Sequence, residues 1–227
     1  MQQNSPYAPP ASSVVSNVTG ERAAKVLQNT YLLLGMSLAF SSAMAWYAMS
    51  AGVSFINVWL VLGVYIGTLI FTNVMRNSAW GILGVFALTG WLGFTTGPII
   101  SMFMQTAGGT QIVTMALAST ATIFVVMSGI ALVTKKDFSF LSNFLMIGLI
   151  VAFLCGLGAM FFNMPALSLA VSGAFVLLSS LLIMWQTSAI IHGGETNYIM
   201  ATVTLFVSIY NLFMSLLHIM SALSGDD

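Results

Sequence analysis

Polar side chains recur at helical spacing through the last apolar segment of the chain, residues 198–223. Thr204, Ser208, Asn211 and Ser215 stand three or four residues apart among Ile, Val, Leu, Phe and Met, so in a helix they share one face. Such a line either joins neighbouring helices through interhelical hydrogen bonds or borders a path for water or ions. For Ser and Thr the joining role is favoured, because their hydroxyls also bond to their own helix.

A weaker polar line runs through the preceding apolar segment, residues 165–191, where Ser168, Ser172, Ser179 and Gln186 recur. A short turn joins the two segments, so we expect antiparallel neighbours whose polar lines face each other. Gln186 and Asn211 are hard to satisfy within their own helices, which makes them the leading candidates for a functional interior. His218 lies near a helix end, where an imidazole can be accommodated at the membrane interface, so we do not favour a pH-sensing role for it.

No carboxylate falls within either of these segments or within any other apolar run of the sequence. The five Asp and Glu residues are Glu21, Asp137, Glu195, Asp226 and Asp227, all near the ends of apolar runs or in the termini. A proton relay or a buried Ca²⁺ site normally needs such a group, so Ca²⁺ is a weak candidate partner.

Motifs of enzyme chemistry are also missing from the sequence. It contains no H-E-x-x-H, G-x-S-x-G, P-loop or dinucleotide-binding fingerprint. The single Cys155 cannot form a disulfide within the chain and belongs to no C-x-x-C motif. We therefore predict that the protein is not an enzyme and has no cofactor, catalytic residue or metal ligand.

The composition places these polar lines inside a membrane protein. Of the 227 residues, 59% are hydrophobic and only 4% are charged. A water-soluble fold cannot bury so many apolar side chains or cover its surface with so few charged ones. The formal net charge of zero gives no indication of a nucleic-acid partner. The lipid bilayer is the expected surrounding.

Seven apolar runs are long enough to cross a bilayer core, which needs roughly 20 helical residues. The sequence therefore predicts an all-α integral membrane protein with seven transmembrane helices, in which spans six and seven form a polar inner interface. Residues 1–25 are rich in Pro, Ser, Asn and Gln and are expected to be a disordered tail, and residues 224–227 form a short C-terminus. The predicted spans cover residues 26–49, 53–72, 80–104, 111–133, 138–161, 165–191 and 198–223.

The positions of the basic residues predict the orientation, because Lys and Arg near span ends stay on the cytoplasmic side. With seven spans, Arg22, Lys25, Arg76, Lys135 and Lys136 all fall on one side. The N-terminus is then cytoplasmic and the C-terminus extracytoplasmic. The alternative is a re-entrant last segment, whose polar content would allow the C-terminus to return.

Pro98 interrupts the third predicted span, in "GFTTGPII". Proline removes one backbone hydrogen bond and kinks a helix. The favoured interpretation is a kink that shapes packing, and the alternative is a hinge or a broken helix that lines a cavity.

Three motifs give the chain a family resemblance: "GFTTGPII", "TKKDFSFL" and "SAIIHGGETNYIMATVTLFVSIYNLFMSLL". Together with the seven spans they resemble the Bax inhibitor-1 family over nearly all of the chain after the tail. The turn at His192, Gly193, Gly194 and Glu195 is the most specific part. It is similar to the bacterial branch that includes a modulator of the membrane-anchored AAA+ protease FtsH.

The resemblance implies a multi-pass protein of the bacterial inner (plasma) membrane that acts as a slow substrate or inhibitor of an FtsH-type protease. The polar N-terminal tail would be the segment that the protease grips. Ion-conducting members of the family carry a pH-sensing aspartate pair, and the matching positions here are Gln186 and Ser208. Neither residue ionises, so a Ca²⁺ or other ion leak is the alternative function.

Overall fold

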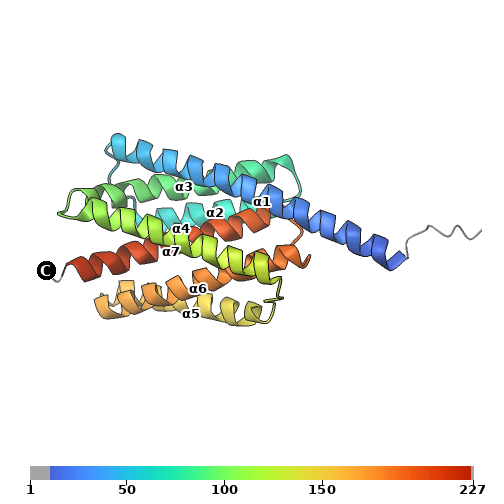
Figure 1. The fold of residues 1–227 in the computed structure, drawn as a ribbon. Coiled ribbons are helices and arrows are strands. Elements are labelled where there is room, and N and C mark those ends of the chain that lie inside the picture. Colours follow the sequence, from blue (N-terminus) through green and yellow to red (C-terminus); the bar gives the residue numbers. More distant parts are fainter. Residues whose placement is uncertain (1–10, 226–227) are drawn as a thin grey trace, which may run out of the picture.

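The computed structural model describes the backbone of residues 11–225 and the side chains of residues 20–225, and within that range every regular element is a helix. The helices run side by side in one bundle (Figure 1). The all-helical part of the predicted fold class is thus confirmed. The helices are α1 Ala11–Ser50, α2 Val58–Val74, α3 Ala79–Met104, α4 Gly109–Thr134, α5 Leu141–Phe161, α6 Pro165–Ile191 and α7 Tyr198–Ser224.

The first two helices differ most from the ranges expected for the spans. Residues 11–25, expected to be disordered, instead belong to α1, because "ASSVVSNVT" contains no Pro or Gly and adds turns to a helix already nucleated downstream. Residues 1–10 of that expected tail lie outside the described residues. The helix α2 begins at Val58 rather than at 53, since the side chain of Asn57 caps it by accepting a hydrogen bond from the Trp59 amide at 2.9 Å.

Among residues 11–225, six of the seven helices are long and apolar enough to cross a membrane: Gly20–Ser50 within α1, and all of α3, α4, α5, α6 and α7. The helix α2 has 17 residues, which span about 26 Å, somewhat less than a hydrocarbon core of about 30 Å. Six spans thus follow from helix length and composition, and a seventh through α2 remains a prediction.

The last helix lies at the centre of the bundle. α7 contacts every other helix except α5, whereas α5 packs along α6 and otherwise reaches α2, where the rings of Phe161 and Trp59 lie 6.0 Å apart. Buried side chains of α1, α3, α6 and α7 form the main hydrophobic core, which includes Leu34, Leu88, Ile183, Leu205 and Leu212. Outward-facing apolar residues cover α5, as expected of a helix that faces lipid.

Glycines let α1 and α3 approach closely, since they add no side chain to the contact. A Cβ atom added at Gly97 would lie 2.6 Å from the Cβ of Ala48 and 2.7 Å from the carbonyl oxygen of Ala45. A Cβ at Gly93 would overlap the backbone of Ser41. This contact brings the backbones of α1 and α3 together near the middle of the bundle.

Candidate functional site

Asn197, at the start of α7, ties the turn between α6 and α7 to the loop between α2 and α3. Its Oδ1 accepts hydrogen bonds from the amides of Ile199 at 3.0 Å and Met200 at 3.1 Å, which caps the helix. Its Nδ2 donates to the carbonyl oxygen of Arg76 and to Oδ1 of Asn77, both at 3.0 Å. One side chain therefore starts α7 and holds a loop more than a hundred residues earlier in the chain.

His192 and Ser188, at the end of α6, hold the loop between α4 and α5. The ring nitrogens Nδ1 and Nε2 of His192 lie 2.9 Å from the Ser188 carbonyl oxygen and 3.1 Å from that of Lys135. A neutral imidazole has one N–H and donates to one of them, whereas an imidazolium donates to both. The Ser188 hydroxyl donates to the carbonyl of Lys136 at 3.0 Å and accepts from the Phe138 amide at 3.1 Å.

The turn over residues 192–197 thus gathers every Lys and Arg of the chain at one end of the bundle. Arg76, Lys135 and Lys136 belong to the two loops that it binds. Arg22 and Lys25 of α1 line a cavity with Gly193 and Glu195 of the same turn. We call this end the basic end, and the turn His192–Gly193–Gly194–Glu195 singled out by the sequence lies at its middle.

Asp137 in the α4–α5 loop has a lowered pKa. The backbone amide of Ser139 donates to Asp137 Oδ1 at 2.8 Å, and this bond, together with that of the Ser139 side chain, is the main cause of the lower pKa. The positive potential of His192 adds to it. A carboxylate therefore sits beside the imidazole that binds the loop.

The polar line of α7 does not form a continuous contact with that of α6. Ser208 is 1% exposed and its hydroxyl donates to the carbonyl of Thr204 in its own helix at 2.7 Å. Ser215 is buried, whereas Thr204 and Asn211 are half-buried. Nε2 of Gln186, 2% exposed, has no hydrogen-bond partner among the described residues. The predicted polar interface of spans six and seven therefore stays a prediction.

One direct side-chain bond does join the two lines, at the end opposite the basic end. The Ser172 hydroxyl of α6 lies 2.7 Å from Nδ1 of His218 in α7. Other polar contacts of α7 run to different helices, from Thr202 to the carbonyl of Thr30 in α1 at 3.3 Å and between Tyr210 and Thr96 of α3 at 3.4 Å.

These contacts of Thr202 and Tyr210 were missed by the sequence argument. Both residues lie on faces of α7 away from the line at 204, 208, 211 and 215, and a single helical line shows one face only. The sequence did contain a signal for these contacts. Hydroxyl residues occur on all faces of this helix, which indicates a helix with neighbours on all sides.

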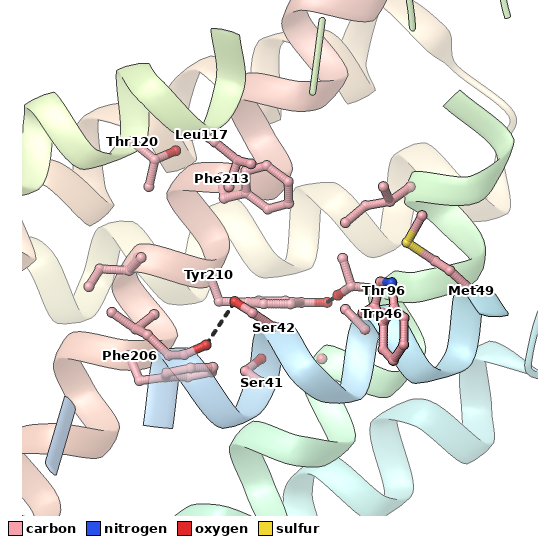
Figure 2. Close-up of a pocket in the computed structure, with 15 residues that line it drawn as sticks. Ser41, Ser42, Trp46, Met49, Thr96, Leu117, Thr120, Phe206, Tyr210 and Phe213 are labelled. Carbon is pink, nitrogen blue, oxygen red and sulfur yellow. Dashed lines mark hydrogen bonds between the residues drawn. The ribbon is translucent and has the colours of Figure 1, made fainter. Parts of the chain in front are cut away.

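A cavity of about 270 Å³ lies between α1, α3, α4 and α7, not between α6 and α7 (Figure 2). Its wall is mostly apolar, with hydroxyls from Ser41, Ser42, Thr96, Thr120 and Tyr210. Figure 2 shows Tyr210 reaching across it from α7 to Thr96. Thr120 and Ser42 donate to carbonyls of their own helices, at 2.7 and 2.8 Å, so these two donors are already used.

Pro98 lies within a continuous helix, since α3 extends through it to Met104. The broken helix considered from the sequence is thus a wrong expectation. The helix continues because the missing amide affects one bond only, to the carbonyl of Phe94. A hinge at the buried Pro98 stays a prediction.

Metal ligands do not gather anywhere in the described part of the chain. No group of three or more His, Cys, Asp and Glu is placed there to hold a metal ion.

Comparison with known proteins matches residues 23–225 to the family model described as "Inhibitor of apoptosis-promoting Bax1". An uncharacterized protein of Pseudomonas aeruginosa is 48% identical over 202 residues, which cover 89% of this chain and 91% of the relative. The "Modulator of FtsH protease YccA" of Escherichia coli K12 is 44% identical over 202 residues, with 89% and 92% covered. A second E. coli relative, also 44% identical with the same coverage, is named "Inner membrane protein YccA".

The family model matches nearly all of the seven-helix bundle, including α7 and the basic end. The bundle, the motifs that form its turns and these relatives agree on a multi-pass membrane protein. The chain therefore belongs to the Bax inhibitor-1 family, and its close relatives include the modulator of FtsH protease of E. coli.

Proposed function

We propose that this protein is an inner-membrane modulator of a membrane-anchored AAA+ protease of the FtsH type. The observation that carries the proposal is the 44% identity, over almost the whole of both chains, to the relative named for that role. The relative named as an inner membrane protein supports the location. On this proposal the basic end faces the cytoplasm, as expected of Lys and Arg next to spans.

In the proposed mechanism the protein is a substrate that the protease engages but degrades slowly. A AAA+ protease needs a terminus to grip, and the N-terminal part of α1 projects beyond the rest of the bundle at the basic end (Figure 1). A helix that stands alone is marginally stable in water, so this part of α1 is easier to unwind than the packed part. The bundle then resists extraction and occupies the protease.

Deletion of residues 2–19 tests this mechanism in cells or in proteoliposomes that contain the protease. We expect slower degradation of the protein, by severalfold or more, and loss of protection for other substrates of the protease. A deletion of Ser224–Asp227 at the opposite end is the matched control and should change neither. A truncated protein that is still degraded and still protects at the wild-type level refutes the mechanism.

The second candidate is an ion or small-solute leak, and one observation favours it. The unpaired amide nitrogen of the buried Gln186 needs a polar partner such as water. Flux through reconstituted liposomes that is lost with Gln186→Leu and Asn211→Leu, but kept with Thr122→Val on the outer face of α4, would support a leak. If liposomes with the wild-type protein and with all of these variants show the same flux as empty liposomes, the protein is not a leak.

A further inference from the structure

A cavity of about 580 Å³ separates residues 22–29 of α1 from the α6–α7 turn at the basic end. Arg22, Lys25, Val26 and Asn29 of α1 line one side of it. These residues follow one another at spacings of three, one and three, so they form a single stripe on one face of the helix. The opposite side consists of Ile190 and the turn residues Gly193, Glu195 and Thr196.

The cavity combines a charged rim with an apolar base. The cations Arg22 and Lys25 and the amide Asn29 are exposed, whereas Ile190 is fully buried and Val26 half-buried. The two cations face one lining carboxylate, Glu195, whose Oε1 accepts the backbone N–H of Asn197 at 2.8 Å. That bond uses part of the hydrogen-bond accepting capacity of the Glu195 carboxylate. With two cations and one carboxylate, the formal charge of the lining is positive.

The position of the cavity fits the boundary between hydrocarbon and water. Arg22 and Lys25 lie in the first turns of Gly20–Ser50, the part of α1 apolar enough to span a membrane. Just beyond, at Thr30, α1 is bonded to α7 through Thr202, so the stripe lies where α1 leaves the packed bundle. Long basic side chains at such a level reach toward lipid phosphates.

We propose that this cavity binds the phosphodiester headgroup of an anionic phospholipid. Arg22 offers the planar N–H pair that matches two phosphate oxygens, and Lys25 adds a second positive charge. Asn29 and Thr196 provide uncharged donors for the remaining phosphate or glycerol oxygens. The half-buried Val26 contacts the first carbons of an acyl chain, and the fully buried Ile190 lies at the base of the cavity. The site does not depend on the proposed protease role.

The test uses the full-length protein in phosphatidylcholine micelles titrated with dioleoylphosphatidylglycerol, with bound lipid counted by native mass spectrometry. We expect Arg22→Gln with Lys25→Gln to weaken binding of this lipid about 25-fold, because each basic residue near an anionic headgroup contributes about fivefold. Lys135→Gln with Lys136→Gln is the matched control. It removes the same charge from the same end but outside the cavity, and should stay within about twofold of wild type.

Two results overturn the proposal. If both double variants lose the same affinity, the attraction is general to the basic end. If millimolar inorganic phosphate displaces the lipid, the site recognises a free anion instead. Should the Arg22 and Lys25 variant fail to fold, Asn29→Leu decides, since it keeps both charges. A severalfold loss supports the cavity, and unchanged binding contradicts it.

Discussion

Single side chains at the basic end each connect parts of the chain that are far apart in sequence. Asn197 caps α7 and donates to Arg76 and Asn77, while His192 reaches Lys135. Apart from the bond to Asn77 Oδ1, these bonds are to backbone groups at helix ends and in loops, where such groups lack partners within a helix. Loss of one side chain therefore affects two elements.

Two substitutions at Asn197 separate its two roles. Asn197→Ala removes the cap and the link to Arg76, and we expect it to lower the free energy of unfolding by about 1–2 kcal/mol. Asn197→Asp keeps an oxygen at the helix start, where a negative charge is favourable, but loses the donor to Arg76. Its cost should be about half as large. Chemical denaturation in detergent measures both, and equal losses would show that the cap contributes nothing.

Asp137 predicts a dependence of stability on pH. Its pKa is lowered in the folded protein, so its carboxylate contributes stability above the pKa of the unfolded chain, and this contribution is lost as pH falls through the lower folded value. We expect Asp137→Asn to lower the melting temperature at neutral pH and to match wild type in strong acid. Melting curves that run from pH 7 into strong acid, below the lowered folded pKa of Asp137, check this. A variant that keeps the full acid-dependent loss would contradict it.

The turn at His192–Glu195 was singled out from the sequence as a family motif, but the contacts of residues 192–197 were not predicted. "HGGETN" stands out because Gly, Asn and Glu end one helix and begin the next. The partners of His192 and Asn197 are 57 and 120 or 121 residues away. Such pairings depend on how the whole bundle folds, which local pattern does not determine.

At the scale of elements, α7 acts as the centre of the bundle more than as the wall of a pore. Its polar line predicted one face toward α6, yet its polar side chains bond to three helices: Thr202 to α1, Tyr210 to α3 and His218 to α6. Helical spacing shows which residues share a face and leaves open how many neighbours surround the helix. The lengths of α3 to α7, by contrast, followed closely from the apolar runs, since their ends lie within three residues of the expected ranges.

The contact between α1 and α3 predicts a contrast between two glycines. Gly97→Ala places a methyl group against Ala48 and the Ala45 carbonyl, so the helices must separate, and we expect a loss of about 1–3 kcal/mol. Gly129→Ala in α4 meets nothing within 4 Å and should be neutral or stabilising by up to about 1 kcal/mol. Thermal unfolding in detergent distinguishes them. Equal effects would mean that close packing at α3 is unimportant.

At the scale of the whole molecule, the helices alternate in direction between the basic end and its opposite. The loop after α1 lies against the end of α3, where Ser54 and Gln105 line one cavity. The C-terminal end of α7 is on this same side of the bundle (Figure 1). If the short α2 crosses the bilayer, the two ends of the bundle face opposite compartments.

Cysteine labelling tests this orientation, and replacing Cys155 with Ala provides a background free of cysteine. In that background we expect a membrane-impermeant maleimide, added to intact cells opened only at the outer membrane, to label Ser54→Cys and Thr106→Cys. Thr196→Cys at the basic end should react only after the inner membrane is permeabilised. Labelling of Thr106 but not of Ser54 would show that α2 does not cross.

The packing of α1 has a mechanical consequence. A force applied to the N-terminus acts along the axis of α1, parallel to the α3 surface on which Gly93 and Gly97 seat it. In that geometry the contacts are loaded in shear, all together, rather than peeled apart one after another. On the proposed mechanism, a motor that pulls on the N-terminus would load all of these contacts at the first helix it meets, and we expect it to stall before that helix yields.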